Sequence, residues 1–318
     1  MSTQKYLIGQ DALNQIIAQT VQNPPNGQIN YILDGPPGIG KTEFFKQLAG
    51  ATMSTLIKAE GPEIKSPRQI NQMIEAIEQT PGQVVLAVDE VHAIAGKQEV
   101  LLPLLDLNYE NLITVMATTE PEKISQAIKS RAIGLKPEDY SREDMKEIVK
   151  DTYNHTSITF TEDALEELTR TARDNPRDVL KKAQFHKSMN PTNSPITADM
   201  IKNGNKALNI DERGLDSDQR TTLKVLANSA GRTAGKSQLT AYLYCHTKIY
   251  EQEIEPPLVK KGLIERTSKG RRITPLGYQH YLKTQQPSSE GSNNIPLENL
   301  DLFIQIGDQR PLNISHGG

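Results

Sequence analysis

Residues 29–42 read INYILDGPPGIGKT, and this stretch decides how the surrounding chain folds. It joins a short β-rich run to a glycine-rich turn that satisfies G-x-x-x-x-G-K-[ST] at every fixed position, from Gly35 to Thr42. Glycines in such a turn let backbone N–H groups point inward around phosphate oxygens without a Cβ clash. Helical spacing follows over residues 43–51. The stretch therefore predicts a strand, a phosphate-binding loop and a helix in succession.

Two side chains at the end of this loop carry the chemistry of a nucleotide site. Lys41 would reach the β- and γ-phosphates, and the Thr42 hydroxyl would ligate Mg²⁺. The helix that begins near Lys41 would point its positive end at the same anion. We therefore expect ATP and Mg²⁺ as cofactors, bound by Lys41, Thr42 and the loop residues Gly35, Pro36, Gly38 and Gly40.

An acidic pair follows the next buried run. Residues 84–88 (VVLAV) have the appearance of a buried parallel strand, and Asp89 and Glu90 come directly after them. An isolated Asp-Glu pair is more often a solvated turn, but after such a strand we expect Asp89 to hold the Mg²⁺ shell and Glu90 to polarise the attacking water. A third apolar run covers residues 112–117, and helical patterns separate the runs. This alternation predicts an α/β fold with a parallel sheet.

Composition excludes several classes of protein. The 318 residues are enough for two or three domains, and 36% hydrophobic against 24% charged residues is typical of globular chains. No apolar run approaches the roughly 18 residues that a membrane span needs, and the N-terminus lacks the apolar region of a signal peptide. The single cysteine, Cys245, excludes an intrachain disulfide framework and reads as a packed core residue. We expect a soluble cytoplasmic protein that does not bind membranes.

Charge is distributed unevenly along the chain. The total is −3, but residues 216–283 carry 12 Lys and Arg against 6 Asp and Glu, a net +6. Residues 1–215 carry a net −6 and residues 284–318 a net −3. A basic block between two acidic ones favours a nucleic-acid partner, with an ordinary solvated face as the alternative.

Beyond residue 137 the pattern becomes helical. Ser141 is expected to cap a helix through residue 149, and Thr161 a second; the Asn175–Pro176 break precedes a third over 177–187, and a fourth covers 198–207. Three further helical patterns and a pair of short strands, typical of a winged helix, cover residues 216–228, 236–244, 248–261 and 262–274. We therefore expect four parts, an ATPase domain at 1–136, a helical lid at 137–210, a winged helix at 211–283 and a flexible tail at 284–318.

Several short motifs together resemble one family. GPPGIGKT, DEVH at 89–92 and ATT at 117–119 resemble the AAA+ ATPases, and within them the RuvB family, the bacterial motors of Holliday-junction branch migration. Further matches over residues 6–283 are LIGQ at 7–10, GP at 61–62, LNIDERGLD at 208–216 and ERTSKGRRIT at 265–274. The resemblance implies an AAA+ parallel-sheet domain, an all-α lid and a C-terminal winged helix on DNA.

The resemblance also assigns roles to single residues. It implies that Ile8 flanks the adenine and that Thr119, or its neighbour Thr118, is the sensor 1 hydroxyl that orients the lytic water. Arg131 matches the finger that reaches the γ-phosphate of a neighbouring subunit, and Arg177 matches the sensor 2 arginine of the lid. Each places a donor or a cation where charge develops in phosphoryl transfer. A finger in trans implies a homo-oligomeric ring or arc, with a hexamer as one form.

The chain departs from the family at three places, one of which is Lys129, where RuvB commonly has an arginine. Only residues 93–116 separate DEVH from ATT, which leaves no room for the β-hairpin on which RuvB docks its partner RuvA. Glu120 follows ATT, where the family carries a basic residue. The resemblance therefore implies an intact ATPase in which docking of RuvA is in doubt.

Two segments are candidates for partner contacts. Lys269, Arg271 and Arg272 are expected on a glycine-containing turn of the wing, suited to DNA phosphates, whereas the acidic residues of 248–261 make that helix a poor groove reader. In the tail, NLDLF at 299–303 resembles the peptide that partners of bacterial sliding clamps insert into the clamp. Its expected anchors are Leu300, Leu302 and Phe303; the alternative is an apolar island that packs on its own core.

These features favour a RuvB-like ATP-dependent motor or remodeller, with helicase activity possible in principle, acting on branched or duplex DNA in recombination, repair or replication. The first alternative is a loader or matchmaker that uses ATP to assemble a sliding clamp, helicase or recombinase on DNA. The second is a nucleotide-gated DNA-binding scaffold without turnover, against which Glu90 and Arg131 argue.

Overall fold

A computed structural model describes residues 5–285, except 95, 97, 174 and 191–193. Contacts divide the chain into two compact units, each described here by itself. The first contains residues up to 221 together with 248–257, and the second contains 222–247 and the described residues from 258 onward. The tail residues Leu300, Leu302 and Phe303 lie outside the described residues. No helix within 5–285, those gaps apart, is long and apolar enough to cross a membrane.

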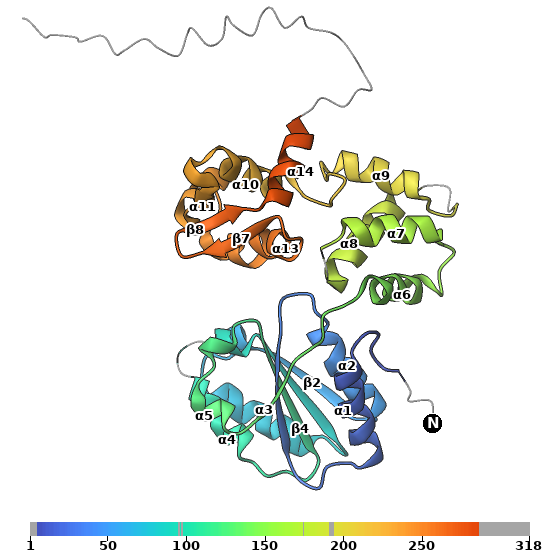
Figure 1. Cartoon of the computed structure of the whole chain (residues 1–318). Helices are drawn as coiled ribbons and strands as arrows, with labels where there is room; N and C mark the ends of the chain where they lie inside the picture. Colours follow the sequence, from blue (N-terminus) through green and yellow to red (C-terminus); the bar gives the residue numbers. More distant parts are fainter. Residues whose placement is uncertain (1–4, 95, 97, 174, 191–193, 286–318) are drawn as a thin grey trace, which may run out of the picture. The chain divides into compact units, whose positions relative to one another are not determined.

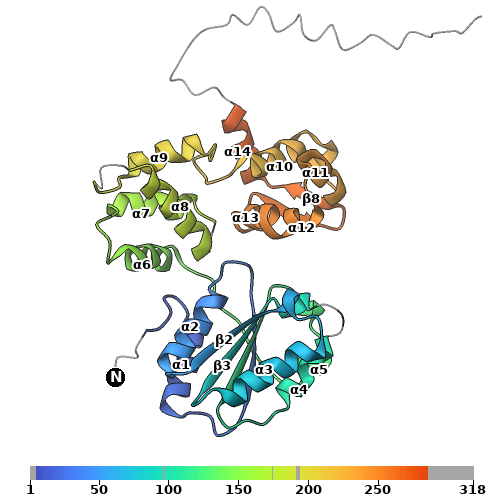
Figure 2. The same ribbon diagram turned by 180° about the vertical axis from the view of Figure 1, so that it is seen from behind.

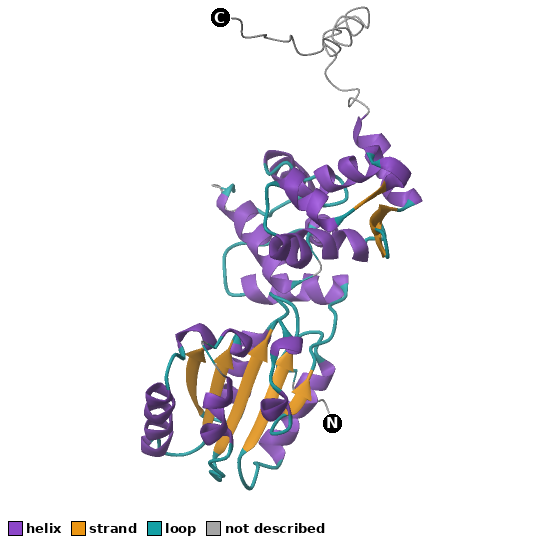
Figure 3. Ribbon diagram, turned by 90° about the vertical axis from the view of Figure 1, so that its left-hand side faces the viewer, coloured by secondary structure: helices purple, strands orange, loops and turns teal. Residues whose placement is uncertain are grey.

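The first unit is built around a parallel sheet whose strands point the same way (Figure 3). The order of its strands is β2-β3-β4-β1-β5. The strand β4 therefore lies between β1, which leads into the glycine-rich loop, and β3, which ends at Asp89. The strands are β1 (Ile29–Asp34), β2 (Thr55–Glu60), β3 (Val84–Asp89), β4 (Leu112–Thr118) and β5 (Ile133–Leu135).

Continuous apolar runs form β3 and β4 because both faces of the sheet are covered. Along β3, Val84, Leu86 and Val88 belong to one hydrophobic cluster, while Val85 and Ala87 belong to the other. Figures 1 and 2 show α1 (Asp11–Gln22) and α2 (Lys41–Ala51) on one face and α3 (Pro67–Gln79) on the other. Successive side chains of a strand point to opposite faces of the sheet, so they pack into two separate cores, one on each face. Together the two cores hold the carboxyl ends of the strands in place.

The link between β3 and β4 is short. Its described residues form the 3₁₀ turns Val91–Ala93 and Gln98–Leu101 and the helix α4 (Leu102–Leu105), and none of them is in a strand. A single-turn helix, α5 (Gln126–Lys129), follows β4. The expected lack of a docking hairpin therefore agrees with the structure of this link over its described residues.

A cluster of helices follows the sheet, as expected. The helices are α6 (Arg142–Tyr153), α7 (Glu162–Thr171), α8 (Pro176–Ser188) and α9 (Ala198–Ala207). Three of them begin at a side chain that accepts a hydrogen bond from a backbone N–H in the first turn. Ser141 accepts the N–H of Asp144 at 3.1 Å, and Thr161 accepts the N–H of Ala164 at 3.3 Å. Asn175 accepts the N–H of Asp178 at 2.9 Å. The expected first helix ends four residues later than predicted because Val149 is buried in the cluster core and the helix continues past it.

The second unit contains a small antiparallel sheet of order β6-β8-β7. Its strands are β6 (Thr233–Ala234), β7 (Ile264–Thr267) and β8 (Gly270–Ile273), and its helices include α11 (Lys236–Leu243) and α14 (Pro275–Gln285). The preceding helix α10 (Ser217–Asn228) continues from the first unit into the second. Helices followed by this hairpin form the expected winged helix.

The helix expected at 248–261 contains an irregularity. It consists of α12 (Thr247–Ile249), a π turn (Tyr250–Ile254) and α13 (Glu255–Lys260). Pro256 and Pro257 lack the N–H groups that would bond to the carbonyls four residues earlier, so the regular ladder is interrupted there.

The wing differs in one detail from expectation. Only Lys269 lies in the turn, whereas Arg271 and Arg272 lie in β8. The pairing of β8 with β7 places Arg272 opposite Glu265, and Arg272 Nη2 lies 2.6 Å from the Glu265 carboxylate. The prediction that all three basic residues sit on the turn was therefore wrong for two of them.

Candidate nucleotide site

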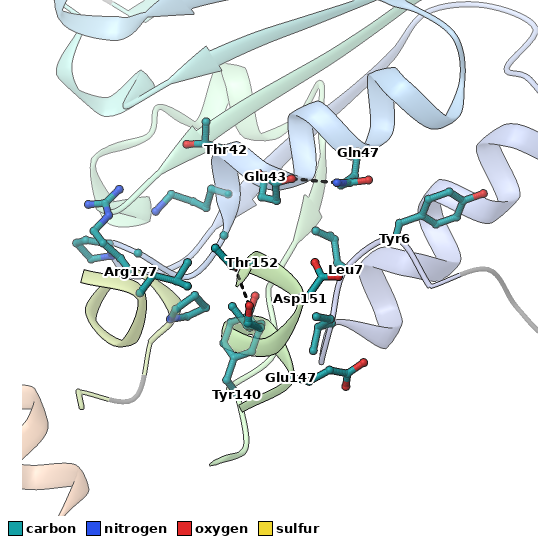
Figure 4. A pocket seen from close by; sticks show the side chains of 18 of the residues that line it. Tyr6, Leu7, Thr42, Glu43, Gln47, Tyr140, Glu147, Asp151, Thr152 and Arg177 are labelled. Carbon is teal, nitrogen blue, oxygen red and sulfur yellow. Dashed lines mark hydrogen bonds between the residues drawn. The ribbon is translucent and has the colours of Figure 1, made fainter. Parts of the chain in front are cut away.

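A cavity of about 620 Å³ in the first unit collects most of the residues expected at a nucleotide site (Figure 4). One end is lined by the glycine-rich loop together with Asp89 and Glu90. The other end is lined by residues 5–8 and by side chains of α6, and the first turn of α8 contributes Arg177. The cavity therefore has one end formed by the glycine-rich loop and the acidic pair, and another end where Leu7, Ile8 and Ile148 lie among polar side chains of α6.

The glycines of the loop are required by both conformation and space. Gly38 and Gly40 have φ of 81° and 99°, in the left-handed region. A Cβ on Gly38 would lie 2.8 Å from the Arg177 Cβ, and one on Gly40 would lie 3.1 Å from the Tyr140 hydroxyl. Larger residues would therefore strain the loop and push away the helices that close over it.

Lys41 begins α2 and points into the loop. Its Nζ donates hydrogen bonds to the carbonyl oxygens of Gly35, at 2.7 Å, and Pro36, at 3.1 Å. Burial lowers the pKa of Lys41, while Glu90 and Asp89 act in the opposite direction. These contacts hold the cation where the β- and γ-phosphates of a nucleotide would lie.

Thr42 and Asp89 form the pair that could hold Mg²⁺. The Thr42 hydroxyl donates a hydrogen bond to Asp89 Oδ2 at 3.3 Å. Hydroxyl and carboxylate oxygens are ligands that Mg²⁺ prefers, and it usually completes its shell with phosphate oxygens and water. The described residues hold no cluster of three or more His, Cys, Asp or Glu side chains that could bind a metal. The donor types of Thr42 and Asp89 fit Mg²⁺.

Glu90 lies beside Asp89 with an unusual backbone. Its φ is 48°, and its carbonyl packs so closely on Gly61 that a Cβ there would clash. The Thr119 hydroxyl donates to Glu90 Oε2 at 3.1 Å. Thr118, the other residue considered for that role, is fully buried and lies against His92 instead. The carboxylate of Glu90 is thus held at the edge of the cavity by Thr119.

The base end is organised by contacts that the sequence analysis did not identify. Asn14 accepts the N–H groups of Tyr6 and Leu7, at 3.1 and 2.8 Å, and donates to the Leu7 carbonyl at 2.6 Å. This fixes the segment that carries Ile8, which lines the cavity. Gln10 is bound on both sides to the backbone of Glu138, at 2.8 Å each.

Tyr140 is the second contribution that was missed. It lines the cavity, and its hydroxyl donates to the Ile39 carbonyl in the glycine-rich loop at 3.1 Å. Burial raises the pKa of Tyr140 to about 12, so the hydroxyl remains a donor at any physiological pH. The only signal in the sequence was its position directly before the Ser141 cap, at the entry to the lid.

The two expected arginines are placed differently. Arg177 lines the cavity next to Gly38. Arg131 does not line it; its Nε lies 2.8 Å from Asp106 Oδ1 and its Nη1 donates to the Ala127 carbonyl at 3.0 Å. Most of the predicted site residues line the one cavity: Ile8, Gly38, Gly40, Lys41, Thr42, Asp89, Glu90 and Arg177. Gly35, Pro36 and Thr119 do not line it but are hydrogen-bonded to Lys41 or Glu90. Arg131 lies apart from both groups.

Comparisons with known proteins identify relatives of two parts of the chain. Residues 31–134 match the model of the ATPase family associated with various cellular activities (AAA), and residues 212–282 match that of the RuvB C-terminal winged helix domain. The Holliday junction branch migration complex subunit RuvB of Staphylococcus aureus is 26% identical over 279 residues, which cover 80% of this chain and 82% of the relative.

Solved structures extend the likeness to the fold. The Holliday junction branch migration motor RuvB of Thermotoga maritima superposes with a TM-score of 0.75 at 25% identity, over 88% of this chain and 96% of the motor. A structure from work on katanin self-assembly superposes with a TM-score of 0.51 at 15% identity, over 63% of this chain and 82% of that one, which is a likeness of fold alone.

Proposed function

Because the chain is a RuvB-like AAA+ ATPase, we propose that it is a motor that couples ATP hydrolysis to the remodelling of branched or duplex DNA in recombination or repair. One observation carries the proposal. A single cavity combines a buried lysine of a glycine-rich loop, a hydroxyl hydrogen-bonded to a carboxylate and a second carboxylate held by Thr119, in a chain that continues into a winged helix of RuvB type. Holliday junctions, named for its relatives, are the substrate that we propose for this chain.

Each residue of the cavity has its own role in the hydrolysis of ATP. Lys41 and the loop N–H groups bind the β- and γ-phosphates, and Thr42 and Asp89 hold Mg²⁺, which neutralises phosphate charge when it is bound. Glu90, held by Thr119, accepts a hydrogen bond from a water and polarises it toward the γ-phosphate. Arg177 adds a cation from the lid side of the cavity.

We propose that Arg131 acts on the nucleotide of a neighbouring protomer, since it does not line the cavity of its own chain. Such an arginine supplied in trans contributes about 10³–10⁵ in rate in related phosphoryl transfers. The active form would then be a ring or arc, with a hexamer as one form. Sedimentation velocity with ATP and Mg²⁺ tests this, and full turnover by a protein that stays monomeric would contradict it.

We also propose that the motor works on DNA without a RuvA-type partner, because the link between β3 and β4 carries no hairpin in its described residues. Lys269, Arg271 and Arg272 would contact phosphates of the duplex. A synthetic four-way junction tests the proposal directly. We expect ATPase stimulation and branch migration with this chain alone, which Lys41→Ala and Glu90→Gln abolish. Turnover that persists in both variants would refute the assignment of the phosphate site.

The loader alternative is not favoured, because the likeness to RuvB extends through the winged helix. Turnover that needs both DNA and a second protein would restore it. We separately propose that residues 299–303 of the tail bind a sliding clamp through Leu300, Leu302 and Phe303. A peptide of residues 295–308 should show saturable binding to the cognate clamp, and no binding would refute this contact.

A further inference from the structure

An imidazole lies between two carboxylates directly behind the cavity. His92 belongs to the 3₁₀ turn that follows Glu90, and its side chain is only 7% exposed. Its Nδ1 lies 3.3 Å from Glu90 Oε2, and its Nε2 lies 3.0 Å from Glu120 Oε1. The ring therefore bridges the water-activating carboxylate and a residue that the sequence analysis singled out without assigning it a role.

Thr118 fixes both ends of this arrangement. Its hydroxyl accepts the backbone N–H of Glu120 at 3.0 Å and lies 3.0 Å from His92 Nδ1. Thr118 is the last residue of β4, which lies beside β3 in the sheet, so its hydroxyl has little freedom to move. The orientation of the ring is thus tied to the central strands.

Glu120 supplies a fixed negative charge on the far side of the ring. It is buried, and its ion pairs with Lys123 and with Lys248, whose Nζ lies 2.9 Å from Glu120 Oε1, lower its pKa to about 2. The contact between Glu120 Oε1 and His92 Nε2 is at ion-pair distance but lies outside hydrogen-bond alignment. Close packing, rather than an aligned hydrogen bond, therefore keeps the ring in place on that side.

We propose that Glu120 is a positioning residue for Glu90, acting through His92. Glu90 Oε2 accepts a hydrogen bond from Thr119 and lies 3.3 Å from His92 Nδ1, and Glu120 packs against the opposite edge of the His92 ring, 3.0 Å from Nε2. The proposal rests on the function proposed above, in which Glu90 polarises the attacking water. Neither His92 nor Glu120 lines the cavity, so their effect falls on the chemical step and not on nucleotide binding.

The test uses the full chain with Glu120→Gln, which keeps the shape of the side chain and removes its charge. Groups that orient metal ligands from behind typically contribute about 10–100-fold, and by analogy we expect kcat for ATP to fall about tenfold. The KM and the affinity for a fluorescent ADP analogue should stay unchanged, whereas the thermal midpoint should fall because Glu120→Gln also removes the ion pairs with Lys123 and Lys248; kcat is therefore measured well below that midpoint. The matched control is Glu122→Gln, two residues further on, which should leave kcat unchanged. A kcat for Glu120→Gln within twofold of the wild type, or a loss matched by Glu122→Gln, overturns the proposal.

A double-mutant cycle separates positioning from a general structural effect. If Glu120 acts through His92, Glu120→Gln combined with His92→Ala loses no more kcat than His92→Ala alone. Losses that multiply overturn the proposal. Glu90→Gln distinguishes a failure of the proposed function from a failure of the positioning role of Glu120. If it retains turnover, the proposed function fails and the positioning role falls with it; if it is inactive while Glu120→Gln is normal, only the positioning role fails.

Discussion

At the residue scale, Tyr140 connects the lid to the phosphate loop through one hydrogen bond, from its hydroxyl to the Ile39 carbonyl. Tyr140→Phe removes this bond and keeps the ring. A neutral hydrogen bond contributes about 1 kcal/mol, so we expect the Kd for ATP to rise about fivefold, as measured by titration with a fluorescent analogue. Tyr153→Phe, on the lid but away from the cavity, is the control. Equal affinities for the two variants would contradict a role for this bond.

The same residue predicts a response to pH. An unperturbed tyrosine ionises near pH 10, whereas the pKa of Tyr140 is about 12. A raised pKa of an acid means that the neutral donor persists to higher pH in the folded protein, so the bond to Ile39 is present at pH 10. The ratio of ATP affinities of the wild type and Tyr140→Phe should therefore be the same at pH 8 and pH 10. A ratio that falls to one at pH 10 would contradict it.

Residues of the site differ in how far the sequence could predict them. Lys41, Thr42, Asp89 and Glu90 follow from short motifs, because their roles depend on neighbours in sequence and on a strand that ends there. Tyr140 contacts a residue 101 positions away. Its role, like the contact of Glu120 with His92, depends on which distant segments the fold brings together, and no local pattern carries that information.

At the element scale, the contact of Arg131 with Asp106 ties the loop after α5 to the end of α4. If Arg131 works in trans, this contact competes with its use by a neighbour. Exposed ion pairs contribute about 0–1 kcal/mol, so Asp106→Ala should raise the ATPase rate up to about fivefold at low protein concentration. The measurement is the rate as a function of protein concentration.

Two outcomes bear on this prediction. In the variant Asp106→Ala with Arg131→Ala the stimulation should disappear, since it depends on the released arginine. Asp106→Ala that is as inactive as Arg131→Ala would instead mean that the pair is needed intact, and the competition between the two contacts would be refuted.

Elements differed in predictability according to length and burial. The strands β3 and β4 were predicted because burial on both faces demands long apolar runs. The strand β5 spans three residues and β6 two, too short for a period-two pattern to emerge. The helix α3 was not predicted, although Ile70, Ile74 and Ile77 lie at helical spacing and could have identified it. The π turn before Pro256 required knowledge of which backbone bonds the two prolines remove.

At the scale of the whole molecule, the small net charge of −3 conceals the basic block at 216–283, which carries 12 basic against 6 acidic residues. In the proposed function the acidic and basic regions have different tasks, since an anionic nucleotide is bound by a few oriented groups whereas a duplex is bound by many cations. The proposed function therefore predicts that DNA binding can be weakened without loss of the ATPase itself.

Lys269→Ala, at the turn of the wing, tests whether DNA binding can be weakened without loss of the ATPase. Each phosphate contact contributes about 0.9 to the slope of log affinity against log salt concentration, so we expect the slope for duplex binding to fall by about one, equally for unrelated sequences. Arg272→Ala should have a smaller effect, because Arg272 is paired with Glu265 at 2.6 Å. Lys283→Ala, in α14, is the matched control. Basal ATPase should stay constant in all three variants while stimulation by DNA falls with affinity in Lys269→Ala. A slope unchanged by Lys269→Ala would remove the wing turn from the DNA interface, and a loss of basal ATPase would mean that the wing supports the nucleotide site by some other route.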